Sequence, residues 1–85
     1  MVGIKMAYYK KKDWKRFLKL IDDRENMHET WEEWERAYKK TKKELSDLGF
    51  DVQDVVVNLN ELTTYCKNQG IQNTVSARSQ FVENK

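Results

Sequence analysis

Apolar and aromatic side chains recur at alternating intervals of four and three residues in the middle of the chain. The pattern begins at Met27 and ends just before Gly49. Its positions are Met27, Trp31, Trp34, Tyr38, Thr41, Leu45 and Leu48. Such spacing places side chains on one face of an α-helix. The pattern therefore predicts one long helix, around which the rest of the chain is organised.

Both ends of this stretch carry residues that are typical of helix boundaries. Asn26 and Thr30 each precede a glutamate by three residues, as in a capping box. We expect the helix to begin at Asn26, because this start brings one more apolar residue onto the apolar face. At the other end, Gly49 suits the left-handed conformation, and Phe50 is placed to fold back onto Leu45 in a Schellman motif.

Two shorter elements are predicted before the long helix. Residues 2–8 alternate apolar with other side chains, which is typical of a strand, and a frayed end over residues 1–9 is the alternative. Residues 11–22 are predicted to form a helix. Its apolar face consists of Trp14, Phe17, Leu18 and Ile21. Because only residues 22–25 would separate the two helices, we expect them to form an antiparallel hairpin.

β-branched residues replace the helical pattern after the long helix. Residues 51–57 contain four valines, three of them consecutive. This composition predicts a short buried strand or an extended segment that crosses the helices. Whether it pairs with residues 2–8 in a two-stranded sheet is left open by the sequence.

The last third of the chain predicts a pair of helices. Asn58 can cap the first of them, and Gly70 ends it. The second starts at Asn73 or Thr74, and we expect residues 79–85 to fray. The predicted fold class is therefore mainly α, with a helical hairpin, a short extended or β segment and a C-terminal helical pair.

The length of 85 residues predicts a single domain over residues 1–85. A chain this short buries only about 60–65% of its extended surface, so we expect modest stability unless it oligomerises. The one cysteine, Cys66, excludes an intramolecular disulfide and fits a reducing cytoplasm. No apolar run approaches about 18 residues, so no membrane span is expected.

The net charge of +2 conceals blocks of opposite sign. Residues 1–21 contain seven Lys or Arg and one Asp, which gives +6, and residues 22–35 contain one Arg and seven acidic residues, which gives −6. Residues 36–48 contain five basic and two acidic residues, which gives +3. Such blocks favour pairing within the chain or between subunits as readily as binding to an anionic partner.

Few residues in the chain are suited to catalysis. The one histidine, His28, and the one cysteine, Cys66, fall on different predicted elements, so nothing places them together as a nucleophile and its base. Metal sites need about three or four clustered ligands, and the three glycines are isolated, so no phosphate-binding loop is present. We therefore expect a protein that is not an enzyme and has no cofactor or metal.

Protein–protein association is the function that the pattern favours most. Three tryptophans and a valine-rich strand are many for so short a chain, and Trp and Tyr are common anchors of interfaces. An open strand edge also allows a homodimer to form across a two-fold axis. The candidate interface residues are Trp31, Trp34, Tyr38, Val55 and Val57. The alternative is that the same aromatic face serves only as core.

Binding of nucleic acid is the second function that the sequence suggests. The segment from Tyr8 to Arg16 interleaves aromatic with basic side chains. Basic groups neutralise phosphates, and aromatic rings stack on bases. The candidate residues in this segment are Lys11, Lys15 and Arg16. The opposing interpretation is that Trp14 packs in the core.

The C-terminal third resembles a helix-turn-helix unit. Cys66 is a small residue four positions before Gly70, and the segment from Thr74 to Arg78 is similar to the start of a recognition helix. The interval between these two parts is one residue shorter than is usual in that family. The resemblance implies that Arg78 contacts nucleic acid.

Three further segments carry another resemblance. They are Met27–Trp34, Glu61–Cys66 and Ala77–Val82. Together they resemble short bacterial open reading frames of unknown function, which often travel on mobile elements. The resemblance implies a bacterial source and assigns no activity and no functional residue.

Overall fold

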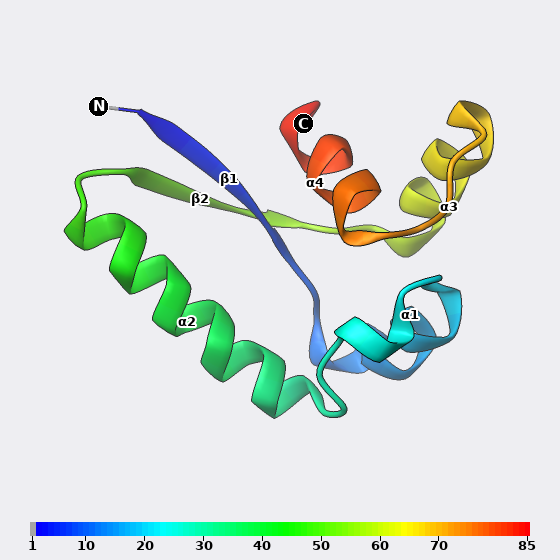
Figure 1. Ribbon diagram of the computed structural model, residues 1–85, viewed down its shortest axis with the longest axis horizontal. Coiled ribbons are helices and arrows are strands. Elements are labelled where there is room, and N and C mark those ends of the chain that lie inside the picture. Colours follow the sequence, from blue (N-terminus) through cyan, green and yellow to red (C-terminus); the bar gives the residue numbers. More distant parts are fainter. Residues whose placement is uncertain (1) are drawn as a thin grey trace.

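The computed structural model describes residues 2–85, which are mainly helical with a short parallel sheet (Figure 1). In chain order, with η marking a 3₁₀-helix, the elements are β1 (Gly3–Tyr8), η1 (Lys11–Asp13), α1 (Trp14–Leu20), η2 (Arg24–Asn26), α2 (Trp31–Asp47), β2 (Asp51–Val56), α3 (Leu59–Gln69) and α4 (Val75–Glu83). The predicted fold class is confirmed as mainly α with a short β segment, whereas the helical hairpin is corrected below. For the range 1–9, the strand interpretation holds from Gly3 to Tyr8, and residue 1 lies outside the described residues.

β1 and β2 pair in parallel along their whole length, from Gly3 opposite Asp51 to Tyr8 opposite Val56. The Val57 N–H also donates to the Tyr8 carbonyl at 3.0 Å, which continues the ladder by one bond. Parallel strands require a long crossover, and α1 and α2 supply it. In Figure 1, α2 lies on one side of the sheet and α3 and α4 lie on the other. The α4 helix packs against β1, and α2 packs against β2.

The start of α2 differs from the prediction. Thr30, not Asn26, is its N-cap: the Glu33 N–H donates to Thr30 Oγ1 at 3.2 Å, and this hydroxyl donates to the Glu33 carboxylate at 2.9 Å. Asn26 instead ends η2, because the Met27 N–H closes that turn on the Arg24 carbonyl at 3.1 Å. Thr30 thus satisfies one free N–H of the first turn, and the bond from its hydroxyl to the Glu33 carboxylate holds the cap in place.

The end of α2 follows the prediction. Gly49 has a φ of 95°, and the Phe50 N–H donates to the Leu45 carbonyl at 3.1 Å. The Gly49 N–H donates to the Ser46 carbonyl at 3.0 Å, which completes a Schellman motif. The turn sends the chain directly from α2 into β2.

The predicted hairpin of α1 with α2 is wrong. The α1 helix ends at Leu20, residues 21–30 separate it from α2, and α2 packs against β2. The reason lies in the connector, which is anchored to the C-terminal region. The Asp22 N–H donates to the Asn73 carbonyl at 2.9 Å, and Asp23 is paired with Arg78. These bonds hold the connector against α4 and prevent a tight turn.

The C-terminal helices begin where the sequence predicts. Asn58 accepts from the Glu61 N–H at 3.1 Å, Gly70 ends α3 with a φ of 66°, and Thr74 precedes α4. Fraying is predicted over residues 79–85, whereas α4 continues to Glu83. Its late residues Phe81 and Val82 are buried, so core packing holds this segment in place.

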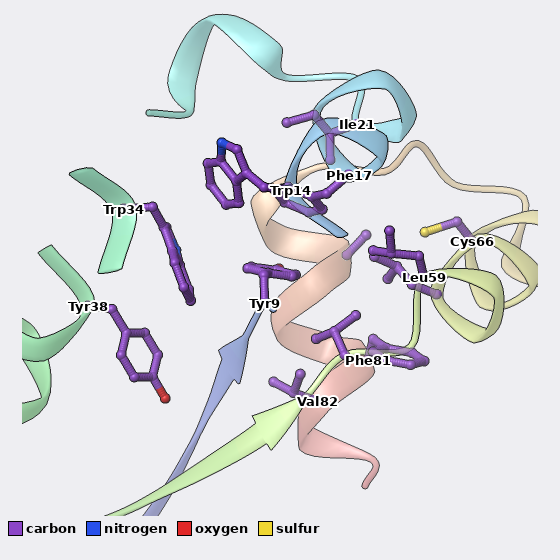
Figure 2. Close-up of a cluster of buried hydrophobic side chains, with 13 residues drawn as sticks. Tyr9, Trp14, Phe17, Ile21, Trp34, Tyr38, Leu59, Cys66, Phe81 and Val82 are labelled. Carbon is purple, nitrogen blue, oxygen red and sulfur yellow. The ribbon is translucent and has the colours of Figure 1, made fainter. Parts of the chain in front are cut away.

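The core gathers side chains from all the α-helices and from the residue after each strand (Figure 2). Tyr9 lies near its centre, stacked on Phe17 with ring centroids 4.1 Å apart and tilted against Trp34 at 5.3 Å. Val57 occupies the equivalent place after β2 and is also buried. The two strands therefore lead directly into the core at their carboxyl ends.

Candidate protein-interaction site

An apolar groove of about 330 Å³ lies along the outer edge of β1. Its floor consists of Lys5, Met6, Ala7 and Tyr9. One wall comes from α2 and consists of Trp34, Ala37, Tyr38 and Thr41. The other wall comes from α4 and consists of Val75, Arg78, Ser79 and Val82. Figure 2 shows the rings of Trp34 and Tyr38 on one side of β1 and Val82 on the other.

The backbone of β1 has open hydrogen-bonding groups at this edge. The carbonyls of Val2 and Tyr8 accept from Asp51 and Val57, so the even-numbered residues of β1 face β2. The N–H and C=O groups of Lys5 and Ala7 therefore point away from β2. Within residues 2–85, these groups have no hydrogen-bond partner. Such an edge is a template for a further strand.

Trp31 closes one end of the open edge. Its indole Nε1–H donates to the Tyr9 carbonyl at 2.8 Å, which is the next outward-facing carbonyl after Ala7. The Lys11 amino group lies over the same indole, 5.9 Å from the ring centroid. The edge that remains open therefore ends at Ala7.

The α2 wall is held rigidly by contacts behind it. The ring of Tyr8 meets those of Trp34 and Tyr38 edge to face, with centroids 5.5 Å apart in each pair. The Tyr38 hydroxyl donates to the Asp54 carboxylate, which also pairs with Lys42 at 3.0 Å. Burial raises the pKa of Tyr38, and the Asp54 carboxylate raises it further, so the phenol stays a donor at neutral pH. A wall fixed in this way is preorganised for a ligand.

Arg78, in the α4 wall, is held by a buried ion pair. Only 3% of Arg78 is exposed, and its guanidinium donates to both carboxylate oxygens of Asp23 at 3.0 and 3.1 Å. It also donates to the Asn73 carbonyl at 3.0 Å. Burial would raise the pKa of the Asp23 carboxyl, but the hydrogen bonds and charge of Arg78, with the Val75 N–H, hold this pKa below its ordinary value.

This geometry corrects the expectation that Arg78 contacts nucleic acid. Its donors are directed at Asp23 and Asn73 inside the protein, so they are not accessible to a phosphate or a base. The exposed face of α4 carries Ser76, Ser79 and Gln80 but no basic residue. The helix-turn-helix resemblance therefore loses the cation on which its nucleic-acid contact depended.

The predicted interface residues are mostly interior. Trp34 and Tyr38 are 8% and 7% exposed, and Val57 is 3% exposed. Val55 is half-buried against the core, and so is Trp31. The structure brings Trp34 and Tyr38 to the groove as parts of its wall, but it places Val55 and Val57 elsewhere. The aromatic face of α2 is therefore mainly part of the core, and two of its rings also border the groove.

Sequence reasoning missed the groove itself. Lys5 and Ala7 carried no candidate role, because alternation along residues 2–8 shows a strand without showing which edge of it is paired. Ala37 and Thr41 lie one turn apart on α2, and their small side chains leave the space that the neighbouring rings border. The register of β1 with β2 determines that Lys5 and Ala7 face outward, and the packing of α2 and α4 brings the two walls beside them.

The basic N-terminal candidates stay at the surface, without the aromatic rings between them. Lys11 pairs with Glu32 at 2.8 Å, Arg16 donates to the Asn60 side chain, and Lys15 is exposed. Tyr9 and Trp14 are buried in the core, and the half-buried ring of Tyr8 packs against Trp34 and Tyr38. The rings of this segment are therefore not available for stacking on bases.

Across residues 2–85, no three His, Cys, Asp or Glu side chains gather where they could hold a metal ion. No helix in that range has the length and apolar character that crossing a membrane requires. Burial raises the pKa of the Cys66 thiol, which keeps it protonated at neutral pH. Neither a family model, nor a curated protein, nor a solved structure matches the chain.

Proposed function

We propose that this protein is a non-catalytic interaction module that binds an extended segment of another protein by adding it as a strand to β1. The observation that carries the proposal is the open backbone of Lys5 and Ala7, which faces a walled apolar groove. In strand addition, main-chain hydrogen bonds supply affinity and the walls select side chains. Both contributions have a physical source in this groove.

The two walls define the chemistry of the bound segment. Successive side chains of an added strand point alternately toward α2 and toward α4. Because both faces of that strand would be covered, the segment is expected to be apolar in its centre. The gap at Ala37 and Thr41, bordered by two rings, suits the larger of its side chains.

A foreign segment fits the groove better than a second copy of the chain. A two-fold axis between antiparallel β1 strands would keep both α2 helices on one face of the joined sheet. Both α2 and α4 border the space beside β1, so the helices of the two copies would compete for it. We therefore favour a partner protein over the homodimer, and the mass of the particle in solution tests the homodimer.

The test begins with random heptapeptides displayed on phage and selected on the immobilised protein. Enriched peptides are resynthesised with a fluorophore, and their affinity is measured by anisotropy. Ala7→Pro removes an outward N–H and fills the groove while leaving every bond between β1 and β2 intact. The one lost main-chain bond contributes about 0.5–1.5 kcal/mol, which corresponds to about two- to tenfold weaker binding. Because the proline ring also occupies the position of the added strand, we expect a loss at or above the upper end of this range.

Val56→Pro is the matched control. Val56 is outward-facing at the opposite edge of the sheet, so the same substitution is made there without touching the groove. It should leave peptide affinity unchanged, and circular dichroism should show both variants folded. Equal binding by Ala7→Pro would contradict strand addition. A failure to enrich any peptide, together with a dimeric mass in sedimentation, would favour self-association.

The nucleic-acid alternative has less support. Lys15 and Arg16 are exposed and available to phosphates, but the aromatic rings that the alternative needs for stacking on bases are packed inside the protein. Fluorescence anisotropy with short DNA and RNA at two salt concentrations addresses it, because phosphate contacts weaken steeply as salt rises. Tight, salt-dependent binding that Ala7→Pro leaves unchanged would favour nucleic acid as the partner over a peptide.

A further inference from the structure

A second cavity, of about 400 Å³, lies at the carboxyl ends of the two strands. The segments that follow β1 and β2 form it together, and its lining is mostly polar. From the first segment come Lys10, Lys12, Asp13 and Arg16, and from the second come Val57, Asn58, Leu59 and Asn60, next to Val56 at the end of β2. It shares no lining residue with the apolar groove.

Positive charge is concentrated in this cavity. Lys10, Lys12 and Arg16 contribute three cations, against the single carboxylate of Asp13. Within residues 2–85, none of the three cations is in a salt bridge, whereas the neighbouring Lys11 pairs with Glu32. Like charges that line one cavity repel each other, so an anion inside it gains attraction from all three.

The second segment supplies neutral polar groups on residues that line the same cavity. It is the start of α3, where Asn58 already accepts from the Glu61 N–H at 3.1 Å. The N–H groups of Leu59 and Asn60, in the first turn, have no intrahelical acceptor. The Asn60 side chain also accepts from Arg16 Nη2, which ties the guanidinium to the helix start. Cations and amide donors from two strand ends therefore converge.

We infer that this cavity binds the phosphate group of a small molecule. Ligands of parallel sheets bind outside the carboxyl ends of the strands, and this cavity lies where both strands end. A phosphate offers several acceptor oxygens to a guanidinium, two amino groups and backbone N–H groups at once. The inference is independent of the peptide groove, because the two sites use different residues.

The test is a titration of the ¹⁵N-labelled protein with inorganic pyrophosphate, followed by NMR. We expect saturable shifts at the amides of Leu59 and Asn60 and in residues 10–16. The double variant Lys12→Gln/Arg16→Gln should bind at least about tenfold more weakly, because two charge-assisted contacts are lost.

The matched control is Lys15→Gln/Lys19→Gln, which makes the same change in charge on α1. Both lysines are exposed and neither lines the cavity, so pyrophosphate affinity should stay near that of the unmodified protein. Equal weakening in the two double variants, or no saturable shift, would overturn the inference. Short single-stranded DNA that outcompetes pyrophosphate and weakens equally in both variants would overturn it too, in favour of a general nucleic-acid surface.

Discussion

The interior around Arg78 and the cavity around Arg16 present the same side chain in two different settings. The guanidinium of Arg78 is buried, and both oxygens of Asp23 and the carbonyl of Asn73 accept its hydrogen bonds. Arg16 is exposed, and it bonds only the amide oxygen of Asn60. One arginine is held by a carboxylate inside the protein, and the other keeps donors directed to solvent.

This difference shows that the local density of basic residues does not mark the cation that stabilises the interior. Asp23 and Arg78 are 55 positions apart, and neither the connector nor α4 shows a local pattern that joins them. Arg16 lies in a run of basic residues that is conspicuous in the sequence, yet that run makes few contacts inside the protein. The density of charge along a chain therefore indicates exposure better than it indicates structural importance.

The largest expected effect is on the interior, through Trp34→Ala. The indole of Trp34 is packed against five other aromatic rings, so its removal leaves a large cavity at the centre of the core. We expect a loss of about 3–5 kcal/mol in the free energy of unfolding, measured by urea denaturation. Trp31→Ala, at a half-buried ring, should cost less. A Trp34→Ala variant as stable as the Trp31→Ala variant would mean that the aromatic face of α2 is not the core.

The next effect compares the two arginines directly. Arg78→Met leaves the carboxylate of Asp23 buried without a cation, and we expect a loss of about 3 kcal/mol. Arg16→Met makes the same change at an exposed site and should alter stability by less than about 0.5 kcal/mol. Both values come from urea denaturation at pH 7. In the double variant Asp23→Leu/Arg78→Met, part of the loss should return, because no buried charge remains. Equal losses in the free energy of unfolding for Arg78→Met and Arg16→Met would show that the buried arginine stabilises the protein no more than the exposed one.

The sequence predicted those parts of the fold that depend on neighbouring residues. The Schellman motif at Gly49 and the cap at Asn58 follow from residues within a few positions of each helix end. The start of α4 does not, because Thr74 makes no side-chain cap bond and the distant Asp23 accepts from the Val75 N–H. The start of α2 was misplaced because Asn26 and Thr30 offer similar local signals, and a separate 3₁₀ turn used the first of them. The local sequence therefore indicates two possible starts for α2 and does not decide between them.

The candidate site could not be predicted in the same way. The register of β1 with β2 determines which residues face outward, and it joins positions 48 apart, as with Ala7 and Val55. The same holds for the cavity at the strand ends, where Arg16 meets Asn60. The sequence indicates Arg16 as a candidate, but Asn58 and Asn60 on the other side of the cavity belong to a segment that the sequence predicts only as the start of a helix.

The smallest of these effects on the interior follows from pH. Because the folded-state pKa of Asp23 is lowered, its ion pair contributes full stability above the ordinary carboxyl value of about 3.9, and this contribution is lost as the pH falls through the folded-state pKa. The midpoint of urea denaturation should therefore drop between pH 5 and pH 2. In Asp23→Asn the drop should be shallower but still present, because the pKa of Asp54 is also lowered, by the hydrogen bond from Tyr38 and by Lys42. An equally steep drop in Asp23→Asn would show that the Arg78 pair contributes nothing to acid sensitivity, and that exposed carboxylates such as Glu32 account for it.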